Sequence, residues 1–281
     1  MLNLQSHFEG AMQLWRERLS CRAPNCRGRK PWARIMDGNG SACLHGRRYC
    51  FPGCFGQELQ RRVNELRLLS AQKPRPRHRV PLGLVLLSRG ELDDDQLRRA
   101  LEAQRRDGSG RIGEWLQRLG FVHEHQITAA LGFQWSCPVL RTLPEQAANC
   151  SVPFHLLRRF RMSPVHFNAS ARKLHLAFAA DIEYRALLAI EQMLDCEAEP
   201  CLADASAVQN WLESNEEQAG GADPVFENVR SPEEISRILV SYATKLCADD
   251  ARVTACGEYI WARIQSGDDA TNLLFRRANA S

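Results

Sequence analysis

Apolar and polar positions along the chain change their spacing several times, and each change marks a different structural segment. Helical spacing in the N-terminal half gives way to a mixture of helical and strand-like spacing further on. Two stretches rich in Pro, Gly or charge, 71–79 and 215–224, have the composition of linkers. We therefore expect an α+β multidomain protein with domains at 1–70, 80–214 and 225–281.

Each expected domain has its own pattern. The first joins a short helix at 1–19 to a cysteine-rich basic module that ends in a helix at 56–69. The second begins with a tandem helical-hairpin unit and continues as a mixed α/β unit at 143–214, where Asp181 is expected to cap a helix. The third is a small α+β tail, in which a helix at 231–247 precedes three short strands.

The tandem unit consists of two 24-residue blocks, Pro81–Gln104 and Arg111–Gln134, that match in register. Seven positions are identical, far more than two unrelated segments of this length share by chance. Each block predicts a helix, a turn and a second helix. The identical pairs are Gly83/Gly113, Leu86/Leu116, Gly90/Gly120, Gln96/Gln126, Ala100/Ala130, Leu101/Leu131 and Gln104/Gln134.

Residue types within each block support this interpretation. Gly90 and Gly120 suit the positive φ that ends a first helix, and Asp93 and His123 lie where a second helix is capped. The glycine at the third position and the glutamine at the last are not core residues by type. A glycine permits close backbone approach, and a glutamine amide offers a donor and an acceptor to a ligand.

Composition excludes several classes of protein. With 44% hydrophobic and 25% charged residues, the 281-residue chain is neither fibrous nor wholly disordered. No apolar run approaches the roughly 18 residues that a membrane span needs. The first twenty residues carry charges where a signal peptide has its apolar core. We expect a cytoplasmic protein with no membrane span.

Charge is spread unevenly along the chain. Residues 1–80 hold 16 Lys and Arg against 5 Asp and Glu, a net charge of +11, so the remainder carries −7. A basic surface of this kind suits nucleic acid, acidic lipid or an acidic protein, and it also simply keeps a small module solvated. The residues concerned are Arg22, Arg27, Arg29, Lys30, Arg34, Arg47, Arg48, Arg61 and Arg62.

Cysteines are concentrated in the same region. Five of the 11 lie within 34 residues, which favours a metal over disulfides in a chain without an export signal. Thiolates near a helix start are electrostatically favoured, and zinc folds small modules that have few apolar groups. The preferred zinc ligands, in a treble-clef-like layout, are Cys21, Cys26, Cys50 and Cys54.

The spacing within each cysteine pair is loose, so other ligands remain open. Cys43 or His45 is an alternative to one member of the set. If Cys43 is not a ligand, we expect it in the core of a hairpin at 41–49 as a small apolar residue. Trp32 is the expected anchor of that core.

The tandem blocks resemble a known family, the N-terminal cyclic-di-GMP-binding domain of type II secretion and type IV pilus ATPases. That family repeats a 24-residue motif that opens with Arg-Leu-Gly and closes with Gln. The match covers 81–134, and residues 143–214 resemble the α/β part that follows in the same ATPases. The resemblance implies that cyclic-di-GMP is the ligand and that a protein of the secretion or pilus machinery is the partner.

Carried over position by position, the resemblance assigns ligand-binding residues to both blocks. In the first block they are Leu82, Gly83, Leu86, Leu87, Gly90, Leu97, Leu101 and Gln104. In the second block they are Arg111, Ile112, Gly113, Leu116, Gly120, Leu131 and Gln134.

Departures from the motif weaken the ligand prediction more than the fold prediction. Pro81 replaces the first arginine, and arginine is the natural partner of a phosphate or of a guanine edge. Arg79, two residues upstream, is a candidate substitute. Glu91, Gln117 and Phe121 replace aliphatic residues of the motif.

The ATPase motor of that family has no counterpart in this sequence. The chain has four lysines, and none precedes Ser or Thr as a P-loop requires. No Ser-His-Asp, Cys-His or paired-carboxylate set stands out either. We expect a non-catalytic adaptor or regulator that senses a nucleotide second messenger. The alternatives are a ligand-free interaction scaffold with the same fold, and a zinc-dependent regulator that binds nucleic acid through residues 20–80.

Overall fold

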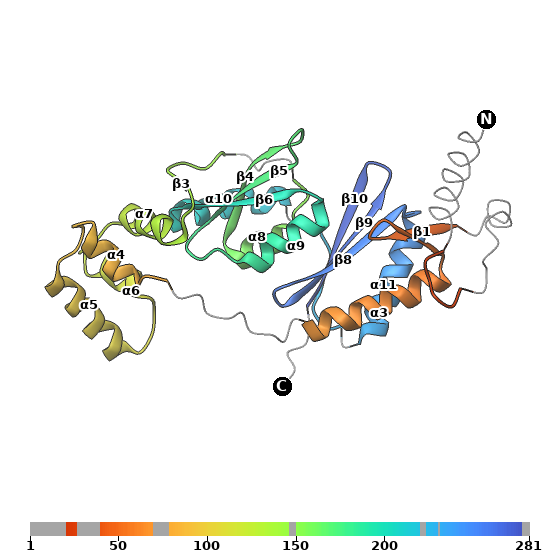
Figure 1. Ribbon diagram of the computed structural model, residues 1–281, viewed down its shortest axis with the longest axis horizontal. Helices are drawn as coiled ribbons and strands as arrows, with labels where there is room; N and C mark the ends of the chain where they lie inside the picture. Colours follow the sequence, from red (N-terminus) through yellow and green to blue (C-terminus); the bar gives the residue numbers. More distant parts are fainter. Residues whose placement is uncertain are drawn as a thin grey trace, which may run out of the picture. The chain divides into compact units, whose positions relative to one another are not determined.

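The structure is a computed structural model that describes residues 21–26, 40–69, 79–145, 150–219, 223–229 and 231–276. The chain divides into two compact units, one made of residues 1–73 with 221–281 and the other of residues 74–220 (Figure 1). The expected helix at 1–19 and the expected anchor Trp32 lie outside the described residues.

The first unit is built on a six-stranded sheet with the order β2-β1-β8-β9-β10-β7. β1 runs parallel to β8 and β10 runs parallel to β7, whereas the other neighbours are antiparallel. The strands are β1 Ser41–Leu44, β2 Arg47–Cys50, β7 Val225–Phe226, β8 Asp250–Cys256, β9 Tyr259–Ser266 and β10 Asp269–Arg276.

Two helices, α3 Gly53–Leu69 and α11 Pro232–Lys245, pack against each other and against strands of this sheet (Figure 1). Alternate strand positions face them, so Val253 and Ile260 share one core with Phe55 and Leu59 of α3. Ser231 caps α11 through the Glu234 amide, at the helix start that the sequence predicts.

The structure departs here from the expected domain division. The segments at 1–70 and 225–281 share one sheet and one hydrophobic core instead of forming separate domains. The physical reason is the size of the hairpin, because two four-residue strands do not form a stable sheet alone. Pairing of Leu44 with Ala251 extends the hairpin into the larger sheet.

The second unit contains a mixed four-stranded sheet with the order β3-β6-β5-β4. β4 and β5 form the expected hairpin, and α9 connects β5 to the parallel strand β6. The elements are β3 Val139–Leu140, α8 Phe154–Phe160, β4 Met162–Asn168, β5 Lys173–Phe178, α9 Tyr184–Leu194, β6 Glu197–Ala203 and α10 Ala205–Ala219.

Two sequence predictions in this sheet region need correction. Glu183, and not Asp181, caps α9, because its side chain accepts a hydrogen bond from the Arg185 amide. The stretch 215–219 belongs to α10 rather than to a linker. Asn215 is buried there and donates hydrogen bonds to the carbonyls of Trp211 and Glu145.

The tandem blocks fold as predicted, each into a helix, a turn and a second helix. The helices are α4 Leu82–Ser88, α5 Asp94–Asp107, α6 Ile112–Arg118 and α7 Glu124–Trp135. Gly90 and Gly120 have positive φ at the turns, and Asp93 and His123 begin the second helices. The blocks pack reciprocally rather than as two stacked hairpins, because α4 lies against α7 and α5 lies against α6.

The shared core of the first unit makes a testable prediction. We expect Leu59→Ala in α3 to cost about 2–5 kcal/mol through the cavity that it leaves. Hydrogen exchange by mass spectrometry should then show faster exchange in β8 and β9, while β5 and β6 remain protected. The matched change Leu176→Ala in β5 should speed exchange in β5 and β6 and leave β8 and β9 protected. Unchanged exchange in β8 and β9 after Leu59→Ala would contradict a shared core.

Candidate ligand and metal sites

Most of the apolar residues that the family motif assigns to a ligand lie in the core of the tandem unit. Leu86 and Leu116 are fully buried at equivalent positions of α4 and α6. Partly buried side chains pack around them, namely Leu82, Leu87, Leu97 and Ile112. Leu101 and Leu131 are also only partly exposed. These side chains therefore serve first to pack the four helices together.

The glycines at the third position of each block have a packing role that the sequence analysis did not expect. A Cβ on Gly83 would lie 2.7 Å from Leu97 Cδ1, and a Cβ on Gly113 would lie 3.2 Å from Leu82 Cδ2 and 3.4 Å from Ile127 Cγ2. Leu97 and Ile127 are themselves equivalent positions. In both blocks the glycine therefore leaves room for the equivalent side chain of the second helix, Leu97 or Ile127.

The glutamine at the end of each block binds the backbone carbonyl of the residue just before a block. Gln104 Nε2 donates to the Gly110 carbonyl at 2.8 Å, and Gln134 Nε2 donates to the Val80 carbonyl. Gly110 and Val80 each precede the first residue of a block, so the two contacts are pseudo-equivalent. Each contact uses one of the two N–H groups of the glutamine amide within the protein.

Arg111 is the assigned ligand residue with the greatest capacity to bind an anion. Its guanidinium lies 2.5 Å from an Asp181 carboxylate oxygen, and the two side chains are 64% and 57% exposed. Gly110 and Gly120, which have positive φ, lie in the turns before and after α6. No local sequence pattern predicts this contact of Asp181, since only the fold brings residues 111 and 181 together.

The first block has no equivalent of this arginine. Pro81 occupies the position, and the candidate substitute Arg79 is placed elsewhere, with its guanidinium 3.0 Å from the centroid of the Trp135 ring. This cation–π contact holds Arg79 on the end of α7. The two blocks therefore have the same backbone fold but differ in charge at their first residue.

Two contacts tie the tandem unit to the neighbouring sheet region. Glu124 at the start of α7 accepts hydrogen bonds from the Ser206 amide and hydroxyl, at 2.9 and 2.6 Å. Thr128, one turn further, donates to Asp204 just before α10. A change in the packing of α7 would therefore reach the start of α10 directly.

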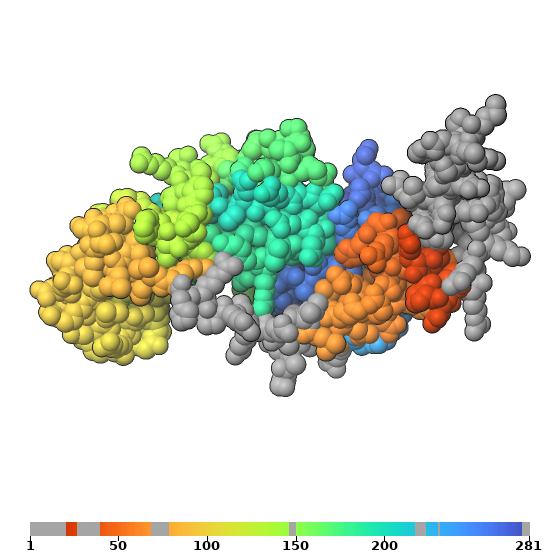
Figure 2. Space-filling view, viewed as in Figure 1, coloured from red at the N-terminus to blue at the C-terminus, as the bar shows by residue number. Residues whose placement is uncertain are grey.

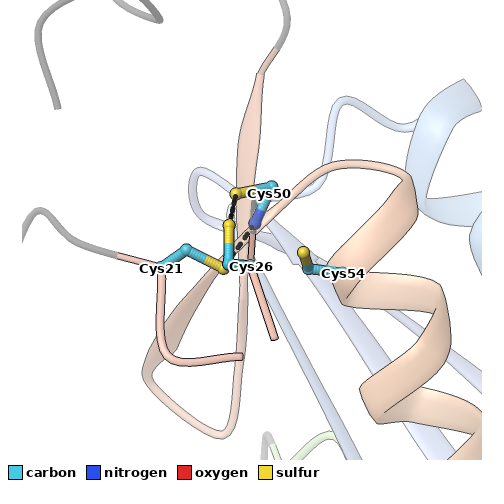
Figure 3. Close-up of side chains that lie close together, drawn as sticks. All are labelled: Cys21, Cys26, Cys50 and Cys54. Atoms are coloured by element: carbon cyan, nitrogen blue, oxygen red, sulfur yellow. Dashed lines mark hydrogen bonds between the residues drawn. The ribbon is translucent and has the colours of Figure 1, made fainter. Parts of the chain in front are cut away.

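The four predicted zinc ligands come together in the first unit. One ligand atom from each of Cys21, Cys26, Cys50 and Cys54 lies within 4.8 Å of the others, and the sulfurs of Cys26 and Cys50 are 3.4 Å apart (Figure 3). Tetrahedral zinc with bonds of about 2.3 Å needs sulfurs about 3.8 Å apart. The cluster has the chemistry and the spacing to hold such a metal ion.

Three elements position these thiols. Cys21 and Cys26 lie on a short loop that is bound to β2 through the Arg22 amide and the Arg48 carbonyl. Figure 2 shows this loop, in red, directly against the orange segment that carries β2 and α3. Cys50 ends β2 and Cys54 lies in the first turn of α3, so only one ligand belongs to the helix start.

The environment of the thiols favours their protonated form when no metal is present. Burial raises the pKa of the Cys54 thiol to about 11, and hydrogen bonds with Cys26 and Cys21 add to this shift. Burial also raises the pKa of Cys21. The Cys50 amide donates to Cys21 Sγ at 3.4 Å, a contact that would equally stabilise a metal-bound thiolate.

The alternative ligands lie outside the cluster. His45 Nε2 accepts a hydrogen bond from the Val253 amide at 3.1 Å, which fixes the hairpin on β8. Cys43 is partly buried on the strand face opposite to Ala42 and Leu44. The prediction that Cys43 enters the hairpin core is wrong, because the two-residue period of β1 gives the core to Ala42 and Leu44.

The basic surface near the cysteines is partly neutralised. Arg61 forms ion pairs with Glu58 and Glu65, and Arg62 lies 3.5 Å from Glu65. Other basic residues that the sequence assigns to this surface lie outside the described residues, namely Arg27, Arg29, Lys30 and Arg34. The described part has no continuous arginine stripe along α3.

In the described ranges, no helix combines the length and apolar character of a membrane span.

Comparisons with known proteins give matches among solved structures. A structure of MshE with cdg is 27% identical, with a TM-score of 0.40, and the match covers 48% of this chain and 98% of that one. A structure of the N-terminal domain of XpsE is 22% identical, with a TM-score of 0.35, over 47% of this chain and 92% of that one. A second crystal form of that domain gives 24% identity and a TM-score of 0.29, over 46% and 90%.

No family model and no curated protein matches the chain. Each likeness spans about half of this chain and at least 90% of the matched one. All three TM-scores are below 0.5.

The glutamine contacts lead to a prediction about stability. We expect Gln134→Ala to destabilise the second unit by about 0.5–1.5 kcal/mol, because the Val80 carbonyl loses its donor. Gln104→Ala should have a similar effect through Gly110. The exposed Gln117 on α6 provides a matched control, and Gln117→Ala should change stability by less than about 0.5 kcal/mol. Chemical denaturation of the full chain measures the free energy of unfolding of all three variants. A loss in Gln117→Ala as large as in the other two would contradict the proposed role of the contacts.

Proposed function

We propose that the second unit is a sensor domain for the second messenger cyclic-di-GMP, in a cytoplasmic adaptor or regulator without catalytic activity. The observation that carries the proposal is the tandem motif itself, folded as two pseudo-equivalent halves that are held by matching glutamine contacts. Cyclic-di-GMP consists of two identical guanosine halves. A protein surface with two like halves is suited to a ligand of that symmetry.

The chemistry at the opening of the second block supports a guanine ligand. A guanidinium such as that of Arg111 can bind a phosphate or the O6 and N7 acceptors of guanine. A carboxylate such as that of Asp181 accepts hydrogen bonds from the donors on the other edge of the base. Both groups are more than half exposed and already adjacent, so a base could meet them with little rearrangement.

Signalling would use the contacts that bind α7 to the sheet region. A ligand that orders the tandem unit would favour one packing of α7, and Glu124 and Thr128 would transmit that preference to α10. This is a population shift, in which the ligand stabilises one of two packings. The surface presented to a partner, proposed to belong to secretion or pilus machinery, would change with it.

Arg111 provides the direct test of the ligand site. Calorimetric titration of the full chain with cyclic-di-GMP should give selective binding, with GTP as the competing control. Arg111→Ala should weaken binding about 10- to 100-fold, because a charge-assisted hydrogen bond contributes roughly 1.5–3 kcal/mol. Asp181→Ala should weaken it less. The exposed Arg106 on α5 is a matched control, and unaltered affinity of Arg111→Ala would refute the site.

A second candidate is a docking domain that has kept the fold and lost the ligand. It is favoured by the burial of Leu86 and Leu116 and by the packing role of the motif glycines, since both explain the motif without a ligand. Pro81→Arg separates the candidates, because it restores the missing arginine. Tighter cyclic-di-GMP binding by Pro81→Arg supports the sensor, whereas the absence of binding in both proteins supports the scaffold.

We further propose that the four-cysteine cluster of the first unit binds one zinc ion. The described donors are four sulfurs, which favour zinc over hard cations such as magnesium or calcium. The metal would fix the loop at 21–26 to the end of β2 and the start of α3. The ion would act structurally, because all four positions of a tetrahedral site are filled by protein ligands.

Metal analysis tests the zinc proposal with a control inside the same module. Protein purified under reducing conditions should contain about one zinc per chain. Cys26→Ser or Cys54→Ser should remove most of the metal, whereas Cys43→Ser should retain it. Metal-free wild-type protein, or equal losses in all three variants, would refute the assigned ligands.

The raised thiol pKa values add a pH dependence to zinc binding. The pKa of Cys54 is about 11 and that of Cys21 is raised, so both thiols are protonated at neutral pH when the metal is absent. Binding must therefore release protons, and zinc affinity should fall as the pH is lowered. Competition with a chelator between pH 6 and 8 measures this slope.

A further inference from the structure

An arginine, a tryptophan and a tyrosine meet at the start of the first block. The Arg79 guanidinium lies 3.0 Å from the centroid of the Trp135 ring, and the ring centroid of Tyr184 lies 6.0 Å from the same centroid. Arg79 directly precedes Val80, whose carbonyl binds Gln134, the neighbour of Trp135. We call the three side chains Arg79, Trp135 and Tyr184 the stacking cluster.

Packing alone does not account for the tryptophan of the stacking cluster. Trp135 Nε1 is buried and has no hydrogen-bond partner among the described residues. A buried N–H without a partner costs free energy, and a leucine or phenylalanine at this position would avoid that cost. At the start of the second block, the positions equivalent to Arg79 and Trp135 are Ser109 and Arg105. The same backbone therefore forms without the cluster, which points to a role in binding.

The chemistry of the stacking cluster suits a nucleobase. A guanidinium is planar and stacks on an aromatic ring much as a base does, so Arg79 covers the part of the indole that a base would use. Tyr184 is 37% exposed, so the cluster opens to solvent. A purine can take the place of the guanidinium on the ring when only the Arg79 side chain moves. The displaced positive charge then lies beside the phosphates of the same ligand.

The stacking cluster lies close to the ion pair at the start of the second block. Asp181, the partner of Arg111, precedes Tyr184 by three residues, and three residues of chain span at most about 11 Å. The starts of the two blocks also adjoin, because α4 contacts α6 and a Cβ on Gly113 would lie 3.2 Å from Leu82 Cδ2 (Figure 1). One cyclic dinucleotide, which carries two bases on a single small ring, can therefore reach both places.

The two places would recognise a base in different ways. Arg111 and Asp181 form hydrogen bonds, which distinguish guanine by its edge. Pro81 at the other place has no N–H, and stacking tolerates any base because every base has a π-face. The Gln134 amide and the Tyr184 hydroxyl each offer a donor and an acceptor, so they suit adenine as well as guanine.

We propose that the stacking cluster binds the second base of a cyclic dinucleotide whether that base is guanine or adenine. The ligands of this chain are then cyclic dinucleotides with at least one guanine. This inference rests on the proposed cyclic-di-GMP site at Arg111 and deepens it by naming the class of ligand. Trp135 and Tyr184 lie outside the residues that the tandem motif assigns to the ligand.

Calorimetric titration of the full chain with three cyclic dinucleotides tests the inference. Cyclic GMP–AMP has one guanine and one adenine, and it should bind within about fivefold of cyclic-di-GMP because stacking tolerates either purine. Cyclic-di-AMP has no guanine edge for Arg111 and Asp181. It should bind about 5- to 100-fold more weakly than cyclic-di-GMP, the loss expected for one specific base contact.

Variants of the tryptophan test the assigned residue. Trp135→Leu should weaken the binding of cyclic-di-GMP and of cyclic GMP–AMP by the same factor, about 5- to 100-fold, which is the contribution of one base–aromatic stack. Trp135→Phe keeps a ring and should restore most of the affinity, which a merely structural role would not explain. Circular dichroism would verify that both variants are folded.

Phe133→Leu provides the matched control. Phe133 is an aromatic residue of the same helix, 69% exposed, and residues two apart on a helix face different directions. This variant should bind both dinucleotides as the unaltered chain does. A loss in Phe133→Leu as large as in Trp135→Leu would contradict the assigned stack.

The outcomes separate this inference from the sensor proposal. Cyclic-di-GMP binding that requires Arg111, with cyclic GMP–AMP as weak as cyclic-di-AMP, would overturn the stacking cluster and leave the sensor intact. Unchanged affinity in Trp135→Leu, or an equal loss in Trp135→Phe, would do the same. If none of the three dinucleotides binds the unaltered chain, the sensor is refuted and this inference is refuted with it.

Discussion

The second unit depends on the reciprocal packing of its two 24-residue blocks. Each block is too short to bury its own apolar stripe, so α4 packs against α7 and α5 packs against α6. Glycine at the third position gives room for a side chain of the second helix, and glutamine at the last position holds the backbone in front of a block. Loss of a glutamine contact would loosen both blocks at once, because each joins the last residue of one block to the residue before the other.

Two surfaces with the same backbone have acquired different chemistry. The opening of the second block presents Arg111 beside Asp181, a pair suited to a charged, hydrogen-bonding ligand. The first block begins with Pro81 in place of the arginine, and Val80 and Leu84 beside it are 56% and 52% exposed. The buried positions that hold the fold, such as Leu86 and Leu116, remain alike in the two blocks.

The first unit differs from the second in that its sheet is assembled from two segments separated by about half of the chain. The short hairpin gains a neighbour in β8, and α3 gains a neighbour in α11. The cysteine cluster lies where the hairpin meets α3 (Figure 3). A metal ion there would stabilise the N-terminal segment of the sheet locally.

The residue pattern alone was enough to predict the helices of the tandem blocks, their turns at Gly90 and Gly120, and the four cysteines that form the cluster. These features depend on local spacing and on residue type, which are visible in one dimension. Tertiary structure decided that two distant segments share a sheet, that Asp181 meets Arg111, and that the motif glutamines bind backbone carbonyls. Such contacts join residues far apart in the chain, and no local pattern records which distant group will satisfy a strand edge, a charge or an amide.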